Sequence, residues 1–137
     1  MAYTIHVVAL ECLKSEEVDG DEIYLKCNGA KFWECAPDKM CAVVDHADFV
    51  NHYDFVERRK HTGQGWVALP PSFTPASVSV RVASGGATVQ LWEADLLSDD
   101  DLLGQTPIDE TQASGGNISV VFQRHGAHYR LTYRVEA

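Results

Sequence analysis

The residues best suited to chemistry are five acidic side chains within nine positions, Glu93, Asp95, Asp99, Asp100 and Asp101. They follow an apolar run and precede an apolar pair and a glycine. Two like charges about 4 Å apart cost on the order of 4 kcal/mol at the effective dielectric of a protein surface. A cation is therefore expected here. Calcium is the natural candidate, because it accepts about six to eight oxygen ligands in flexible geometry.

The spacing of these acids resembles the third calcium-binding loop of C2 domains. That loop leaves a strand as apolar-aromatic-Asp-x-Asp-x-x-Ser-x-x-Asp and continues with an apolar pair and Gly. The resemblance implies calcium ligands at Glu93, Asp95, Ser98 and Asp101, with Gly104 closing the loop. Glu93 departs from the family's Asp by one methylene group.

A second landmark of the family is an acidic first loop between two strands near the N-terminus. Here residues 14–22 form such a loop, and the next strand begins around Tyr24 without the proline that the family usually has. An alignment on Tyr24 makes Glu22 the implied ligand, whereas an alignment on acid identity makes it Asp21. Asp19 is the implied partner from earlier in the loop.

The end of the chain indicates which of two circular permutations the resemblance implies. The chain starts directly on the second strand of the first permutation, so the missing edge strand should come last. Residues 128–135 alternate polar and apolar side chains in that place. We therefore expect the second, phospholipase-like permutation. The resemblance covers residues 3–34 and 77–136 and implies an eight-stranded antiparallel Greek-key β-sandwich.

The chain-wide pattern supports an all-β fold independently of the resemblance. Short alternating segments are separated by Gly-rich turns, which is typical of an antiparallel sandwich. Strands are expected near residues 3–12, 23–28, 31–34, 66–69, 77–82, 88–92, 106–108, 118–124 and 128–135. In the insertion over residues 45–61, apolar residues recur at helical spacing behind a possible Asp45 cap, so a short helix from Asp45 to Lys60 is expected.

Length, charge and cysteine content narrow the class of protein. The 137 residues suit a single domain over 1–137, and a net charge of -9 disfavours nucleic acid as a partner. No signal peptide or transmembrane segment is evident, so we expect a soluble cytoplasmic protein, with non-classical export left open. The four cysteines, Cys12, Cys27, Cys35 and Cys41, lack paired metal-site spacing and are expected to be free thiols.

Leu96 and Leu97 occupy the tip of the third loop. Exposed neighbouring leucines are usually avoided, so these side chains could fold back into the core. Alternatively, they could enter a membrane interface once calcium neutralises the acids behind them.

The function expected from these features is binding without catalysis. A calcium-binding C2-like module would dock to a phospholipid surface or a protein partner through its acidic loops. The alternative is a metal-independent interaction or assembly module on the same scaffold. A lectin-like binder could use Trp33, Trp66 and Trp92 as stacking surfaces. A small hydrolase using Cys35 and His46 is the remaining class, although no familiar catalytic motif is present.

Overall fold

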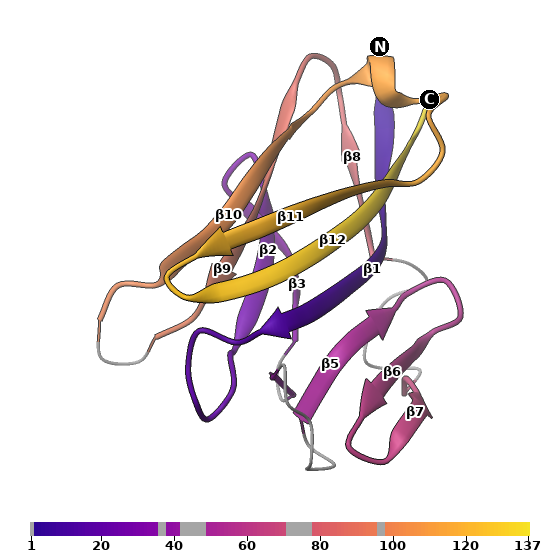
Figure 1. Cartoon of the computed structure of the whole chain (residues 1–137). Coiled ribbons are helices and arrows are strands. Elements are labelled where there is room, and N and C mark those ends of the chain that lie inside the picture. The colour runs from indigo at the N-terminus through magenta and orange to yellow at the C-terminus, as the bar shows by residue number, and fades with distance from the viewer. Residues whose placement is uncertain (1, 36–37, 42–48, 71–77, 96–97) are drawn as a thin grey trace.

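The protein folds into two stacked β-sheets (Figure 1). The structure is a computed structural model, and it describes residues 2–35, 38–41, 49–70, 78–95 and 98–137. The larger sheet contains β1 (Tyr3–Lys14), β4 (Lys39–Met40), β5 (Phe49–Asp54), β6 (Arg59–Thr62), β7 (Gly65–Ala68), β8 (Ser79–Val82), β11 (Ile118–Arg124) and β12 (Ala127–Glu136). The smaller sheet contains β2 (Ile23–Cys27), β3 (Ala30–Glu34), β9 (Ala87–Glu93) and β10 (Asp101–Ile108), and the short 3-10 helix η1 spans Glu110–Gln112.

The predicted antiparallel β-sandwich is confirmed. The described residues form twelve strands, and four of them, β4 to β7, come from the insertion between β3 and β8. The other eight strands match the number that the resemblance to C2 domains implies, and β7 of the insertion lies where the strand near residues 66–69 is expected. These eight divide evenly, with β11-β12-β1-β8 in one sheet and β10-β9-β2-β3 in the other. The insertion extends the first sheet, because β5 pairs with the second half of β1 and β6 and β7 follow it.

Alternating side chains from both sheets form the core. In β9, Ala87, Val89, Leu91 and Glu93 are all buried and point inward as one row. The buried row of β1 changes from odd to even positions after Val7, where a register shift interrupts its pairing with β12. Glu93 is thus a carboxylate at the end of an otherwise apolar row, next to the loop that follows β9.

The last strand pairs within the sheet, as the sequence predicts. β12 lies between β11 and β1, with antiparallel hydrogen bonding to both. Tyr129, Leu131 and Tyr133 form its buried face. In Figure 1 the two termini lie close together at one end of the sandwich, and the loops after β1 and β9 lie at the other end.

The predicted helix from Asp45 to Lys60 is wrong over the residues that the structure describes. Residues 49–54 form strand β5, and a turn connects it to β6. Val50 and Tyr53 are both buried although they lie three positions apart, because the pairing of β5 with β6 shifts between Val50 and His52. This irregularity gives a strand the apolar spacing of a helix. Asp45 itself lies outside the described residues.

No helix among the described residues is long and apolar enough to cross a membrane.

All four cysteines are free thiols and buried, which confirms the prediction that they are unpaired. Burial raises the pKa of the Cys12 and Cys35 thiols to about 12. Both therefore act as small apolar residues of the core.

Gly104 is expected to be intolerant of any side chain. A Cβ at this position would lie 2.3 Å from Cγ of the buried Phe122, whereas a Cβ at Gly86 would have its nearest neighbour at 3.8 Å. We predict that Gly104→Ala lowers the free energy of unfolding by at least about 1–3 kcal/mol. Gly86→Ala is the matched control and should change it by much less. Denaturant unfolding measures both, and equal effects of the two substitutions would contradict the packing described here.

Candidate metal centre

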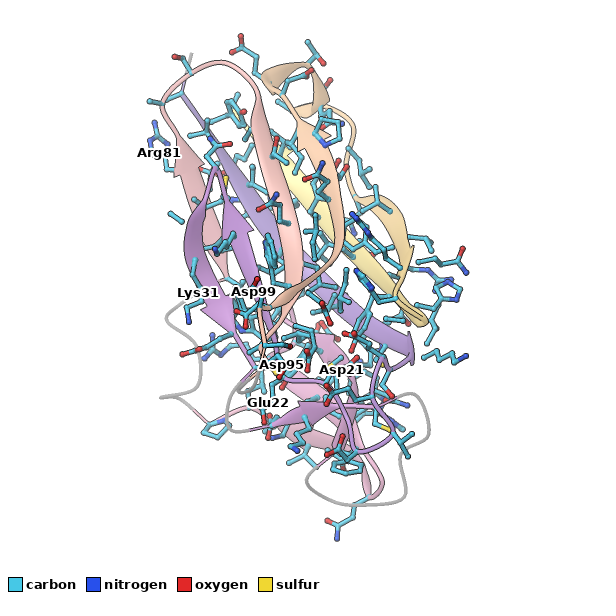
Figure 2. The ribbon with its side chains drawn as sticks, turned by 90° about the vertical axis from the view of Figure 1, so that its left-hand side faces the viewer. Asp21, Glu22, Lys31, Arg81, Asp95 and Asp99 are labelled. Carbon is cyan, nitrogen blue, oxygen red and sulfur yellow. The ribbon has the colours of Figure 1, made fainter. Side chains whose placement is uncertain are left out.

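The loops after β1 and β9 lie side by side at one end of the sandwich. The Ala94 amide donates a hydrogen bond of 2.7 Å to the Glu22 carbonyl, which ties the two loops together. Figure 2 shows Asp21, Glu22 and Asp95 gathered at this end, whereas Arg81 lies toward the opposite end. The fold therefore concentrates carboxylates from two distant parts of the sequence in one place.

Asp21 fixes the shape of the first loop. Its buried carboxylate accepts hydrogen bonds from the Glu16 and Glu17 amides, at 2.8 and 2.9 Å, and from the Tyr129 hydroxyl at 2.6 Å. The Asp21 backbone also exchanges two hydrogen bonds with Met40. Burial raises the pKa of Asp21, and the hydroxyl and the two amides oppose that shift. Asp21 therefore holds the loop in position from within the core.

Asp100 holds the third loop by accepting hydrogen bonds, as Asp21 does in the first loop. Its carboxylate accepts hydrogen bonds from the Tyr24 hydroxyl and, at 2.9 Å, from the Asp95 amide. The hydrogen bond from Tyr24, followed by the one from the Asp95 amide, lowers the pKa of Asp100. Ser98 donates to Asp95 Oδ2 at 2.8 Å, so one contact orients the Asp95 side chain while the other holds its backbone amide.

Glu93 is a buried acidic side chain at the end of β9. It is 1% exposed, and its Oε2 atom is buried with no hydrogen-bond partner among the residues that the structure describes. Burial, followed by the nearby charge of Glu17, raises the pKa of Glu93 to about 8. A buried carboxylate normally has a counter-charge or hydrogen-bond donors. Its environment here favours a positive charge close to Oε2.

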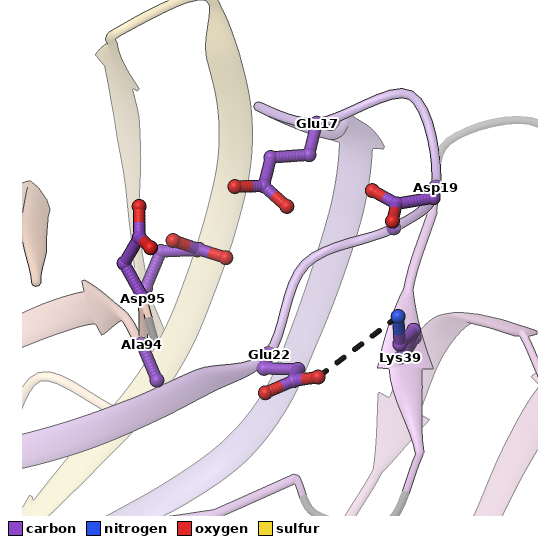
Figure 3. Close-up of a pocket in the computed structure, with 8 residues that line it drawn as sticks. Glu17, Asp19, Glu22, Lys39, Ala94 and Asp95 are labelled. Atoms are coloured by element: carbon purple, nitrogen blue, oxygen red, sulfur yellow. Dashed lines mark ion pairs between the residues drawn. The ribbon is translucent and has the colours of Figure 1, made fainter. Parts of the chain in front are cut away.

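Glu17, Glu93 and Asp95 form a cluster that could hold a cation. One carboxylate oxygen from each lies within 4.8 Å of the others. The cluster faces a cavity of about 440 Å³ that Asp19, Gly20, Glu22, Lys39 and Ala94 also line. Figure 3 shows the Glu17, Asp19, Glu22 and Asp95 side chains around this cavity. Several carboxylates, with no nitrogen or sulfur ligand among the described residues of the cluster, suit a hard divalent ion such as calcium.

The sequence-predicted ligands fall into three groups. Glu93 and Asp95 lie together, and Asp19 and Glu22 line the same cavity, where Glu22 is 3.9 Å from the Lys39 ammonium. Asp21 is buried beneath the loop, and Ser98 supports Asp95. The remaining ligand, Asp101, lies in a separate cluster with Glu16 and His125. Leu96 and Leu97, the predicted membrane tip, lie outside the described residues.

Sequence reasoning missed Glu17. The ligands that the sequence predicts in the first loop are Asp19 and either Asp21 or Glu22, so Glu17 is not among them. The hydrogen bonds that the Glu16 and Glu17 amides donate to the Asp21 carboxylate set the direction of this segment. To identify Glu17 as a potential ligand, one would have had to predict the conformation that these hydrogen bonds give the loop.

Comparisons with known proteins give matches in structure only. No protein-family model and no curated protein sequence matches the chain. Among solved structures, human GIVD cytosolic phospholipase A2 in complex with methyl gamma-linolenyl fluorophosphonate inhibitor and terbium chloride matches with a TM-score of 0.41 and 11% identity, over 98% of this chain and 17% of that one. Human GIVD cytosolic phospholipase A2 described without a ligand matches with a TM-score of 0.42 and 12% identity, over 98% of this chain and 15% of that one.

The chain therefore spans 15–17% of the length of these phospholipase chains. With TM-scores below 0.5, the matches do not by themselves place the chain in a family. The β-sandwich architecture rests on the two sheets, and the similarity to C2 domains rests on the loop residues.

The raised pKa of Glu93 predicts how the stability of the metal-free protein depends on pH. The side chain has a pKa of about 8 in the folded state against an ordinary value of 4.5. Between these values the folded state binds more protons than the unfolded chain, so stability falls as pH rises. The stabilising effect is complete below about pH 4.5 and is lost as pH passes about 8.

Thermal unfolding in EDTA from pH 5 to 8 measures this dependence. Glu93→Gln should flatten the decline, because the amide has no proton to lose in this range. Glu34→Gln, at an exposed position on β3, is the control and should leave the decline as it is. An equally steep decline in Glu93→Gln and the unmodified protein would show that Glu93 does not carry the dependence.

Proposed function

We propose that the protein is a non-catalytic binding module that takes up a calcium ion between its two acidic loops. The observation that supports this most strongly is the buried Glu93 carboxylate, whose Oε2 has no partner among the described residues and which faces Glu17 and Asp95. Three carboxylates this close destabilise the folded state unless a cation or protons neutralise them. A divalent ion would relieve the repulsion among all three at once.

The remaining residues of the cavity would complete the coordination. Asp19 and Glu22 supply further carboxylates from the first loop, and Ser98 holds Asp95 in place. A hard, oxygen-rich set of this kind fits calcium better than magnesium, which demands stricter octahedral geometry. The proposed ligands are thus Glu17, Glu93 and Asp95, with Asp19 and Glu22 at the edge of the site.

The proposed role of the ion is to change what the loop end can bind. The chain has a net charge of -9, so the acidic end repels anionic surfaces. A bound divalent cation would reduce the negative charge of the three carboxylates and could coordinate a phosphate oxygen from a phospholipid surface. A protein partner carrying an exposed carboxylate or phosphate is the alternative target.

One observation favours a second candidate, a metal-independent interaction module. The Lys39 ammonium lines the same cavity and lies 3.9 Å from Glu22 Oε1, as the dashed line in Figure 3 marks. The protein thereby supplies a cation of its own at the edge of the acidic cavity. Lys39 is partly exposed, however, and its ion pair is with Glu22, so the Glu93 Oε2 atom still has no partner in the part of the chain that the structure describes.

Calcium should stabilise the fold if it binds only the folded state. At about a hundred times the dissociation constant, the ion should add about 2.7 kcal/mol to the free energy of unfolding. Asp95→Asn should remove most of this gain, because it deletes a ligand at the centre of the cluster. Thermal unfolding in millimolar calcium against EDTA measures the effect.

Asp99→Asn is the matched control for this experiment. Asp99 lies in the same loop and is exposed, but it belongs to neither cluster of potential ligands. The calcium gain should persist in this variant. An unchanged midpoint for the unmodified protein in calcium would eliminate the metal and leave the metal-independent module as the function.

A further inference from the structure

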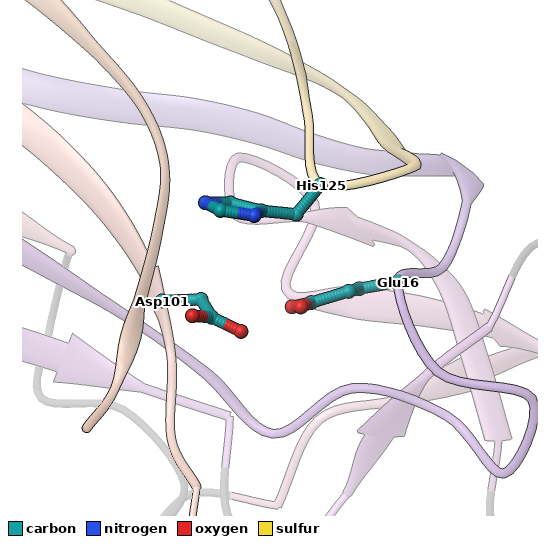
Figure 4. A group of neighbouring side chains, drawn as sticks. All are labelled: Glu16, Asp101 and His125. Atoms are coloured by element: carbon teal, nitrogen blue, oxygen red, sulfur yellow. The ribbon is translucent and has the colours of Figure 1, made fainter. Parts of the chain in front are cut away.

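A second group of potential ligands lies beside the proposed calcium site and has a different chemistry. Glu16 comes from the first loop, Asp101 begins β10, and His125 lies in the turn between β11 and β12. One ligand atom from each lies within 4.8 Å of the others. Figure 4 shows the three side chains converging from three separate segments of the chain.

Two features of the backbone bring these side chains together. Glu16 and Glu17 are consecutive, and the Asp21 carboxylate accepts a hydrogen bond from the amide of each. The same carboxylate therefore positions one glutamate of each cluster. His125 and Gly126 have φ angles of 53° and 81° and form the two-residue connection of the β11–β12 hairpin. Positive φ at both central residues is the mark of a tight hairpin turn, which defines where the imidazole projects.

One oxygen atom of the Glu16 carboxylate is without a partner among the described residues, although Asp101 lies beside the carboxylate. Its Oε2 atom is buried and has no hydrogen-bond partner among the described residues. The Asp101 carboxylate lies beside it, and two like charges this close repel each other unless a cation or a proton is present. Like Glu93, Glu16 is a carboxylate in a place that favours a positive charge, yet it belongs to a different cluster.

The imidazole distinguishes this group from the all-oxygen cluster of Glu17, Glu93 and Asp95. Calcium and magnesium select oxygen ligands, whereas imidazole nitrogen suits zinc, cobalt, nickel, copper and iron. One histidine and two carboxylates would supply three protein ligands and leave a further position for water or a partner. Zinc holds such ligands at about 2.0–2.2 Å, and the exposed His125 side chain is free to close on an ion from the solvent side.

We propose that Glu16, Asp101 and His125 form a second metal site, selective for a borderline divalent transition metal such as zinc. This site goes beyond the proposed calcium function and does not depend on it. The protein would carry two adjacent sites of different selectivity, with Asp21 positioning one glutamate for each. The competing explanation is that Glu16 and Asp101 share a proton and that His125 binds no metal.

Zinc titration into the full chain tests the proposal, with calcium present in excess so that the all-oxygen cluster is not open to zinc. Isothermal titration calorimetry should show one zinc ion per chain. His125→Asn should weaken the affinity by at least about tenfold. Asn is chosen because it tolerates a left-handed backbone at this turn, which keeps the hairpin intact. His128→Asn is the matched control, since His128 lies three residues away and belongs to neither cluster.

Cobalt provides a spectroscopic reading of the ligands. Visible absorption of the cobalt-loaded protein should indicate nitrogen and oxygen ligands and should change in His125→Asn. Sulfur-to-cobalt charge transfer would instead show that a cysteine binds the metal and would overturn the proposal. Unchanged zinc affinity in His125→Asn, or no zinc binding at all, would overturn it as well.

The two metal proposals fail independently. Asp95→Asn should remove most of the stabilisation by calcium while zinc affinity persists. His125→Asn should weaken zinc binding while calcium still stabilises the fold. Loss of both responses in both variants would indicate a single shared site and would contradict the assignment of two.

Discussion

The buried carboxylate of Asp21 accepts three hydrogen bonds, and the geometry of the acidic loop end depends on them. Two come from the Glu16 and Glu17 amides and the third from the Tyr129 hydroxyl on the last strand. Hydrogen bonds to a charged group contribute about 1.5–3 kcal/mol each, which offsets the cost of removing the carboxylate from water. Through Tyr129, the first loop is tied to the centre of the larger sheet. The result is a loop that presents two neighbouring glutamates to two different clusters.

The same end of the sandwich shows how a core row can become a functional site. Glu93 continues the inward row of Ala87, Val89 and Leu91, so the strand that builds the core also delivers a carboxylate beneath the loops. The nearby charge of Glu17 makes the ionised form of Glu93 less favourable still. Groups whose pKa is shifted by both burial and neighbouring charge are concentrated at functional sites. The protein thus accepts a local loss of stability at this end, which a cation would reverse.

The fold could be predicted from the sequence because its signals are local. Alternation of apolar residues locates the strands of the eight-stranded core, and Gly-rich turns separate them. The insertion could not be predicted in this way, because a bulge in β5 places Val50 and Tyr53 on one face and gives a strand the spacing of a helix. Local pattern alone does not reveal such an irregularity.

The site was predictable only in part, for a related reason. Glu93 and Asp95 follow directly from the strand that precedes them, so their place at the loop end can be derived from sequence. The structural role of Asp21 cannot be derived from sequence, because its hydrogen-bond partner Tyr129 lies more than a hundred residues away in the chain. The proximity of His125 to Asp101 depends in the same way on how β11 and β12 pack beside β10. Contacts between distant segments are the part of the site that spacing does not encode.

The central claim is that Glu17, Glu93 and Asp95 share one calcium ion. Its most direct test is an amide chemical-shift map recorded by nuclear magnetic resonance during calcium titration. The account predicts saturable shifts at Glu17, Glu93, Ala94 and Asp95, with little change in the core of β12. Absence of saturable shifts, or shifts centred on the β5–β7 insertion instead, would contradict it.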